Sequence, residues 1–494
     1  MKLLTNFKEY TALFQKFKSL FGTQNMSLGN PLSVMLRFSI PLLIGNIAQL
    51  FYNTADAIIV GKMISADALG AVGASAPIQQ LFFVFFMTVG TGVSVMVAQF
   101  YGAGDKERLS SCVGTSLVLT LIATVSITVL GVPLAGPILK ATGLIDTGVA
   151  NDLYHLARSF LIITFIGATG QGFYNILSGI LRGMGESVFP LIVLLGTSLL
   201  NVALAILFVS LGWGVAGSAW ATAIANAVSA IILLARIRKL RDIISLTRAT
   251  VRLSKKMAGQ ILRIGVPSGI MQVVLATSYI FVQRLINGIF VVNSLGVATN
   301  AIFIAANTAV TKVDGFANLP SQAFSMAGST FAGQNIGAGK FDRVSSGFKI
   351  SFSLCMGTAL LLLAIIYIWG GDMLTLFIDM SKPDSAQIIA LGVRVQRIMV
   401  WCYPIMAVVQ ACNGVIRGAG DTMPVMWFTL IATVVFRVPM AYIMVLSTKS
   451  AEYPGGNPDG IFWSMVICFG LCAAMCAVYY RSGKWKDKAV VRRK

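Results

Sequence analysis

The feature that most constrains this chain is an internal repeat, in which glycine-rich patterns of the first half return in the second half. Ten residues recur 235 positions later, nine of them unchanged, and three residues nearer the start recur 226 positions later. The recurring residues are Gln99, Gly102, Ala103, Gly104 and Arg108 with Gln334, Gly337, Ala338, Gly339 and Arg343; Gly179, Arg182, Gly183, Gly185 and Glu186 with Gly414, Arg417, Gly418, Gly420 and Asp421; and Leu36, Arg37 and Pro41 with Leu262, Arg263 and Pro267. Repetition at a fixed spacing predicts two copies of one structural unit.

The chain is too apolar for a soluble fold. It has 494 residues, 56% of them hydrophobic and 11% charged, whereas ordinary soluble domains carry about 25% charged residues. Twelve stretches are long enough to cross a bilayer, which takes about 20 apolar residues per helix. They lie in 35–60, 68–99, 111–138, 153–181, 188–211, 215–237, 261–290, 295–333, 346–369, 386–416, 424–447 and 460–480. We expect an all-α polytopic membrane protein with twelve transmembrane helices in two six-helix bundles, related by a parallel internal repeat.

The basic residues indicate how the chain is oriented. They outnumber the acidic residues by 38 to 18, and most lie in predicted loops on one side, with nine between residues 236 and 263 and seven between 481 and 494. The positive-inside rule assigns this side, and with it both termini, to the cytoplasm. The net charge of +20 therefore predicts contact with anionic membrane lipid and not with nucleic acid.

Five segments follow from these patterns. They are a cytoplasmic amphipathic N-terminal segment 1–29, an N-lobe 30–240, a cytoplasmic linker 241–258, a C-lobe 259–480 and a basic cytoplasmic tail 481–494. Aromatic side chains in the first segment share one helical stripe, which favours a short helix lying on the inner leaflet, with a flexible tail as the alternative. The stripe comprises Phe7, Tyr10, Phe14, Phe17 and Phe21. No cleavable signal is expected in residues 1–25.

Only two acidic residues lie deep in apolar segments, Asp56 and Asp314. A charge at mid-bilayer costs about 2.5–3.5 kcal/mol, so such residues usually face a cavity or a partner. Gln49, Tyr52, Asn53 and Asp56 are spaced as i, i+3, i+4 and i+7, which places them on one helix face. This face cannot contact lipid, so we expect it to face protein or water inside the N-lobe. Asp56 is the better candidate for an ion or proton site, and a structural hydrogen-bond hub is the alternative.

Asp314 allows two interpretations. Arg284 and Arg437 lie within apolar spans of the same bundle, so an ion pair with Asp314 is a sufficient structural explanation. The second interpretation is a secondary polar or ion site, with Arg284 beside it. Lys312 is two residues away and falls nearly on the opposite helix face, which makes it a poor partner.

Several motifs have plain structural explanations. The glycine-rich segments on the cytoplasmic side are either conformational latches between helix ends or simple turns, and a phosphate-binding loop is excluded because no strands are expected. Cys468, Cys472 and Cys476 share one helix face, which is typical of packing. His155 is the only histidine. No constellation indicates catalysis or a metal site, so we expect neither an enzyme nor a cofactor.

Several of these segments resemble one transporter family. They are the stretch Tyr52-Asn53-Thr54-Ala55-Asp56-Ala57-Ile58-Ile59-Val60-Gly61 after Pro41, the loops Arg182-Gly183-Met184-Gly185-Glu186 and Arg417-Gly418-Ala419-Gly420-Asp421, and the segments Gly212–Gly217 and Gln334–Gly339. Together they resemble the multidrug and toxic compound extrusion (MATE) transporters of bacteria over roughly residues 30–480.

The resemblance implies cation-coupled efflux of amphipathic, often cationic, drugs or organic cations. It places the coupling acid at Asp56, with Tyr52, Asn201 and Thr222 as supporting polar groups. Two departures favour the DinF-like branch: position 205, where some relatives have a second acid, is Ala205, and Gln272–Gln283 lacks the Glu of NorM-like members. A single carboxylate favours H⁺ as the coupling ion, with Na⁺ as the alternative.

We therefore expect a monomeric antiporter of the bacterial inner membrane. Two other transporters remain as alternatives. A flippase of lipid-linked oligosaccharides would use a basic cavity, to which Arg284, Lys312 and Arg437 could contribute. A major-facilitator transporter would explain the Gly102-Ala103-Gly104-Asp105 loop but not the second pair of repeated loops. A channel or membrane-embedded enzyme is the alternative from a different class.

Overall fold

The computed structural model describes residues 22–142, 144, 153–292, 298–381, 383–449 and 455–491. The predicted interfacial helix between Phe7 and Phe21 lies outside these residues. Within them, ten helices are long and apolar enough to cross a membrane, and the bent pair α12 (Ser385–Met399) and α13 (Cys402–Gly418), which meet at 43°, provides an eleventh span. The remaining predicted span, 295–333, corresponds to two successive helices, α9 (Ala301–Ala317) and α10 (Leu319–Gly337).

The predicted span over 295–333 is therefore built from two helices and not from one. The helix is interrupted at Asn318, where the backbone carbonyl of Asp314 accepts both from the side-chain amide of Asn318 at 3.0 Å and from its backbone N–H at 3.1 Å. Pro320 follows two residues later and lacks the N–H that would bind the preceding turn. Proline is well tolerated in the first turn of α10, so the sequence ends one helix and begins another here.

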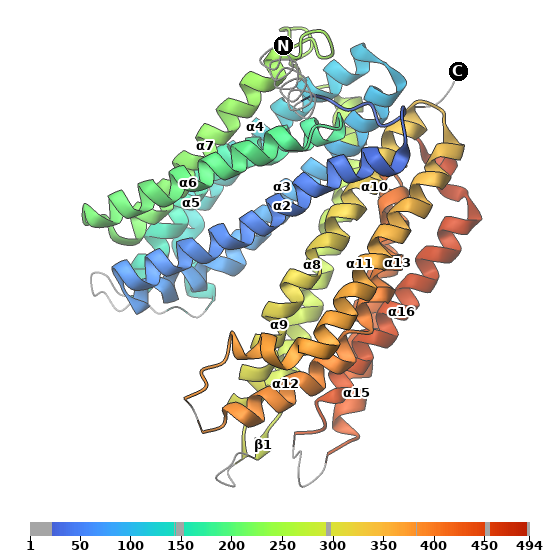
Figure 1. Ribbon diagram of the computed structural model, residues 1–494. Coiled ribbons are helices and arrows are strands. Elements are labelled where there is room, and N and C mark those ends of the chain that lie inside the picture. Colours follow the sequence, from blue (N-terminus) through green and yellow to red (C-terminus); the bar gives the residue numbers. More distant parts are fainter. Residues whose placement is uncertain are drawn as a thin grey trace, which may run out of the picture. The chain divides into compact units, whose positions relative to one another are not determined.

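The chain divides into two compact units. Unit 1 contains residues 1–266, 333–340 and 490–494. Its helices are coloured blue to green in Figure 1, apart from the start of α8 and the end of α10: α2 (Pro31–Ile59), which continues as the π-helix η1 (Val60–Ile64), then α3 (Ala66–Ala103), α4 (Lys106–Ala141), α5 (Leu153–Gly183), α6 (Val188–Ser210) and α7 (Gly214–Lys239). Helix α5 is central, because it packs against α3, α4 and α7, while α6 packs between α7 and α2.

Small residues let α5 and α7 approach closely. A Cβ atom on Gly170 would lie 2.7 Å from the backbone nitrogen of Ala227, and one on Gly167 would lie 2.7 Å from the Cβ of Ala223. Close helix contact through Gly and Ala is the usual means of association in membranes, where burial from water supplies little driving force. This packing fixes α7, the helix that faces Asp56.

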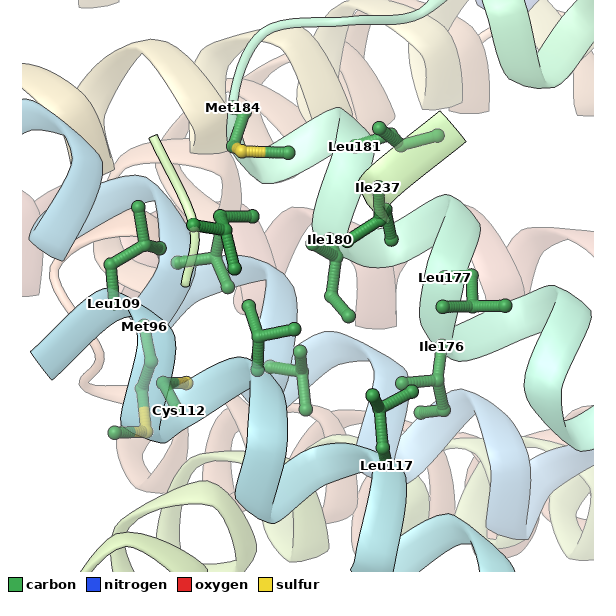
Figure 2. Close-up of a cluster of buried hydrophobic side chains, with 14 of the residues drawn as sticks. Met96, Leu109, Cys112, Leu117, Ile176, Leu177, Ile180, Leu181, Met184 and Ile237 are labelled. Carbon is green, nitrogen blue, oxygen red and sulfur yellow. The ribbon is translucent and has the colours of Figure 1, made fainter. Parts of the chain in front are cut away.

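The main core of unit 1 lies at the end of the bundle where α3 meets α4. Figure 2 shows its buried side chains from α3, α4, α5 and α7, among them Met96, Leu109, Ile180 and Ile237. Val490 and Val491, at the end of the described chain, pack against the same cluster.

Unit 2 contains residues 267–332 and 341–489. Helix α8 (Lys255–Asn287) enters it at Pro267, and α11 (Phe341–Thr375), α14 (Thr422–Leu430), η2 (Ile431–Phe436), α15 (Arg437–Leu446), α16 (Asp459–Ser482) and the short 3₁₀ helix η3 (Lys484–Lys488) complete its helices. Helix α13 packs against both α11 and α16. Two strands, β1 (Val291–Val292) and β2 (Ala298–Thr299), pair antiparallel. These two-residue strands correct the expectation that the chain has none.

The repeated motifs build the same turns twice. Gly104 and its counterpart Gly339 have φ values of 69° and 73°, and Gly185 and Gly420 have values of 83° and 86°. Left-handed backbone of this kind is readily adopted only by glycine, which explains why these positions recur in both copies. Helices α2 and α8 continue through Pro41 and Pro267.

Candidate functional site

The predicted polar stripe on α2 divides into two pairs. The helix begins at a capped turn, where Asn30 accepts from the backbone N–H of Leu32 at 2.9 Å. Gln49 donates to the side chain of Asn53 at 3.3 Å in an exposed contact along the same helix. Tyr52 and Asp56 instead reach α7. The spacing thus predicted the shared face, but only Tyr52 and Asp56 on this face contact another helix of the N-lobe.

Asp56 is held by a serine that sequence reasoning did not single out. The hydroxyl of Ser218, a fully buried residue on α7, donates to Oδ1 of Asp56 at 3.0 Å. Among the described residues, no Lys or Arg forms an ion pair with this carboxylate. Asp56 is also partly exposed, so its carboxylate is not enclosed in the core.

The helix changes form directly after this acid. The backbone N–H of Val60 is shared between the carbonyls of Asp56 and Ala57, and α2 passes into the π-helix η1. Single π-helical turns inside helices frequently occur at functional sites, because they shift the phase of the side chains that follow. The bulge separates the Asp56 turn from the last turn of this span.

A second polar contact lies one helical turn away. The hydroxyls of Tyr52 and Thr222 are 3.4 Å apart, and the amide of Asn201 on α6 donates to Thr222 at 3.0 Å. The structure thus brings together three residues that the family resemblance grouped. Ser218 and Thr222 are four residues apart on α7, so one face of this helix serves both Asp56 and Tyr52.

Asn201 has an unused acceptor. Its side chain is fully buried, and its carbonyl oxygen Oδ1 has no hydrogen-bond partner within the described structure. Most buried polar atoms in proteins are paired, so an orphan acceptor at this place needs an explanation. A proton-bearing group, a water or a cation could occupy it.

The position of the missing second acid is apolar. Ala205 is fully buried in a small cluster with Ile59, Val209 and Ala221. This environment offers no oxygen ligand where some relatives were expected to have a carboxylate. Elsewhere along the same two helices, Ser229 on α7 donates to Thr197 on α6 at 2.8 Å, which extends the polar contact between them.

Asp314 has hydrogen-bond partners and no arginine partner among the described residues. Asn318 donates to its Oδ2 at 3.0 Å, and the hydroxyl of Tyr403 on α13 is a further partner. Arg437, 3% exposed, instead lies over the ring of Tyr279 at 5.3 Å. Arg284 is exposed. The ion-pair interpretation of Asp314 is therefore not supported by the contacts.

The repeated loops make contacts beyond simple turns. In the first copy, Glu186 is 1% exposed and pairs with Arg236 at the end of α7, with Nη2 2.9 Å from its Oε1. Burial raises the pKa of Glu186, and the charge of Arg236 opposes this shift. In the second copy, the hydroxyl of Tyr479 on α16 donates to the carboxylate of Asp421. Each copy thus ties its loop to the last helix of the same copy.

The histidine and the cysteines have ordinary surroundings. The ring of His155 meets that of Tyr154 edge-on at 5.4 Å. Cys468, Cys472 and Cys476 are all buried on α16, and the last of them contacts the side-chain oxygen of Asn413 at 3.6 Å. In the described residues, no group of three His, Cys, Asp or Glu side chains is placed to hold a metal ion.

Comparison with known proteins agrees with this architecture. The model of the MatE family matches the chain twice, over residues 41–207 and 267–443. The chain is 28% identical to the "Probable multidrug resistance protein YoeA" of Bacillus subtilis, over 95% of this chain and 97% of that protein. It is 25% identical to the "Probable multidrug resistance protein NorM" of Thermotoga maritima, over 93% and 94% of the two chains.

A solved structure shares the fold. It is described as the "Outward-facing conformation of a multidrug resistance MATE family transporter of the MOP superfamily", and it aligns with a TM-score of 0.82 at 24% identity, covering 94% of this chain and 97% of that chain. The double match confirms the internal repeat, because one family model fits both halves in the same order. It also separates the chain from the major-facilitator alternative. With its family model matched along both halves and its twelve-helix fold, the chain belongs to the MatE family of membrane transporters.

Proposed function

We propose that this protein is a secondary active transporter that exports amphipathic or cationic small molecules in exchange for protons, with Asp56 as the coupling site. The observation that carries the proposal is the state of this carboxylate, which lies within a membrane helix, has a hydroxyl as its partner and, among the described residues, has no fixed cation. The names of the relatives as multidrug resistance proteins support the substrate class.

The Asp56–Ser218 contact can accommodate both protonation states. When Asp56 is ionised, the serine hydroxyl donates to it, in keeping with the geometry. When Asp56 binds a proton, it becomes a donor, and the serine can rotate to accept. Because the two states use different donors around α2 and α7, proton binding can favour one arrangement of these helices over the other. A transported molecule that favours the opposite arrangement is then exchanged for protons without direct competition.

The composition of the site favours H⁺ over Na⁺. Na⁺ is stabilised by several oxygen ligands, whereas Asp56 is the only described carboxylate at this site and Ala205 is apolar. The orphan carbonyl of Asn201 would be the natural additional ligand if Na⁺ were used. The choice between the two ions is therefore open to direct measurement.

Orientation and assembly complete the proposal. We place the protein in the bacterial inner membrane, in contact with its lipids, as a monomer with both termini in the cytoplasm. The basic segment 236–263 and the basic tail 481–494 support this orientation.

Reconstituted protein in liposomes provides the test. An imposed pH gradient should drive uptake of a fluorescent organic cation, while an Na⁺ gradient alone should not. Asp56→Asn keeps the size of the side chain and can accept from Ser218, but it cannot exchange a proton, so gradient-driven uptake should fall to the background of empty liposomes. Asp314→Asn is the matched control and should retain transport.

The serine is tested in the same assay. Ser218→Ala removes the donor to Asp56 and should slow the exchange several-fold, while Ser218→Thr keeps the hydroxyl and should retain most of the rate. Wild-type transport by Asp56→Asn would refute the coupling role of this acid. Loss of transport in Asp314→Asn alone would move that role to the C-lobe.

A further inference from the structure

The two glutamines of the repeat, Gln99 and Gln334, are buried together at one end of unit 1. Both are 0% exposed. Their helices approach so closely that a Cβ atom on Gly102 would lie 2.0 Å from the carbonyl oxygen of Gln334, and one on Gly337 would lie 2.0 Å from that of Gln99. The end of α3 and the end of α10 therefore touch backbone to backbone, each through the glycine that follows its glutamine.

The N-terminal segment caps one glutamine. We name residues 22–29, which precede α2, the N-strap. The backbone N–H of Met26 donates to the side-chain oxygen of Gln334 at 2.7 Å, and the carbonyl of Met26 accepts from Asn335 at 3.2 Å. Lys340 adds a bond to the carbonyl of Ser27 at 2.9 Å. Met26 itself is fully buried, so the N-strap is part of the packed structure.

The C-terminal segment caps the other glutamine. We name residues 483–491, which follow α16, the C-strap. The backbone N–H of Val490 donates to the side-chain oxygen of Gln99 at 2.8 Å. Trp485 anchors the start of this segment, because its ring is 2% exposed and stacks on that of Tyr480 with the planes 6° apart. The two straps thus supply the same kind of bond to the two repeat-related side chains.

The connections of the straps are crossed. The N-strap continues into α2, in the first repeat, and binds α10, in the second repeat. The C-strap continues from α16, in the second repeat, and binds α3, in the first repeat. Any motion that separates α3 from α10 at this end must break the strap contacts or carry the straps along. Without the straps, two buried amide oxygens would lose these partners.

We propose that the N-strap and the C-strap are a double latch that holds the end of α3 against the end of α10, and that these helix ends separate only when the straps detach from Gln334 and Gln99. The separation of these two helix ends is then controlled by the segments that flank the two repeats. The inference rests on the proposed transport function only in the tethering experiment, which measures transport. The hydrogen-exchange experiment measures the opening of the helix ends and needs no substrate or ion gradient.

Hydrogen exchange of the full-length protein in lipid nanodiscs tests the latch directly. Met26 is the second residue of a turn closed by a bond from the N–H of Leu28 to the carbonyl of Asn25, a position that accepts proline. Met26→Pro removes the backbone N–H that binds Gln334. The control Met26→Ala also loses the methionine side chain but keeps this N–H. Exchange at the ends of α3 and α10 should become about five- to tenfold faster in Met26→Pro than in Met26→Ala.

The second strap gives an independent comparison. Ala489 has φ −52° and ψ 135°, a conformation that allows a following proline. Val490→Pro should accelerate exchange at the same helix ends relative to Val490→Ala. Equal exchange in both proline and alanine variants would show that the straps do not hold the helix ends together, and would overturn the proposal.

A reversible tether gives the functional test. Leu28 and Lys340 are exposed, whereas the seven native cysteines are buried. A cleavable bis-maleimide linking Leu28→Cys to Lys340→Cys should abolish transport, and cleavage of the linker should restore it. Each single-cysteine variant with a monofunctional maleimide is the control for the loss of the native side chain, and its transport rate is the reference for the tethered protein. Full transport by the tethered protein would overturn the proposal, even if Asp56 proved not to be the coupling acid.

Discussion

Glu186 shows how a single buried residue can depend on one partner. Its carboxylate follows α5 in the repeated loop, and only one of its oxygens is paired, because Oε2 is buried with no hydrogen-bond partner in the described structure. Arg236 binds the other oxygen twice, through Nε at 3.0 Å and Nη2 at 2.9 Å. Removing one member of a buried pair typically costs about 3–5 kcal/mol, because the remaining charge is left uncompensated.

The raised pKa of Glu186 predicts a dependence of stability on pH. The folded protein holds this proton at pH values where the unfolded chain has released it, so the stabilisation is full below the ordinary pKa of 4.5 and is lost as pH rises through the higher folded value. Glu186→Gln should remove this contribution. Its unfolding temperature, measured by intrinsic fluorescence in detergent, should fall less than that of the wild type between about pH 4.5 and 7.

Arg236→Met provides the opposing comparison. It leaves Glu186 buried without its cation, so the fall in unfolding temperature with pH should be steeper than in the wild type. Identical slopes in the wild type and Glu186→Gln would show that burial does not control this carboxyl.

Residue-level reasoning singled out side chains that are unusual for their surroundings. Asp56 and Tyr52 stand out in an apolar helix, and the resemblance added Thr222 and Asn201, which contact one another as expected, while their role in coupling stays a prediction. Ser218 was missed because a serine between glycine and alanine looks like an ordinary small packing residue. Its spacing of one turn before Thr222 was the available signal.

At the scale of elements, helix packing is determined by where small residues fall. Gly170 sits where α5 contacts α7, whereas a Cβ atom added to Gly196 on α6 would have nothing within 4 Å. The two glycines are similar in sequence context, since both lie within apolar helices, yet only one is needed for a close approach.

Alanine substitution should separate these two glycines. Gly170→Ala places a Cβ 2.7 Å from the backbone of Ala227, so α5 and α7 must move apart, and overpacking of this kind costs about 1–3 kcal/mol. Gly196→Ala meets no neighbour and should be neutral or stabilising by up to about 1 kcal/mol, because alanine favours helix. Thermal unfolding of both variants gives the comparison, and equal unfolding temperatures would contradict the packing argument. Because α7 carries Ser218 and Thr222, Gly170→Ala should also slow transport.

Helix boundaries were less predictable than helix positions. The predicted span 295–333 became α9 and α10, with the break just before Pro320, which has no N–H to donate to the preceding turn. Hydropathy averages over such local effects. It is equally insensitive to the π-helical segments after Asp56 and before Arg437, because they alter the hydrogen-bond register without changing the apolar content.

At the scale of the whole molecule, the repeat was the most informative feature of the sequence. The offset of 226 is also the spacing between the two matches of one family model, whose first residues, 41 and 267, are the paired prolines. What the repeat could not reveal is which repeated residues meet. Gln99 and Gln334 were recognised as copies, but the packing of each against the glycine of the other copy is a tertiary contact that one sequence does not encode as a pattern.

The orientation of the whole molecule follows from charge and can be tested by labelling. Leu253 lies in the basic linker before α8, and Met380 lies after α11. Helix α11 begins directly after the glycine-rich loop of the second repeat. Helix α11 crosses from that loop to the opposite side, and both residues are exposed. Translocating a basic segment is unfavourable, so the linker should stay in the cytoplasm and Met380 should face outward.

A membrane-impermeant maleimide added to intact cells should therefore label Met380→Cys and leave Leu253→Cys unmodified until the membrane is permeabilised. The seven native cysteines are buried and should not react with the maleimide, so the wild type gives the background signal. The reverse pattern would place both straps outside the cell, and the latch would then act on the outer side of the membrane.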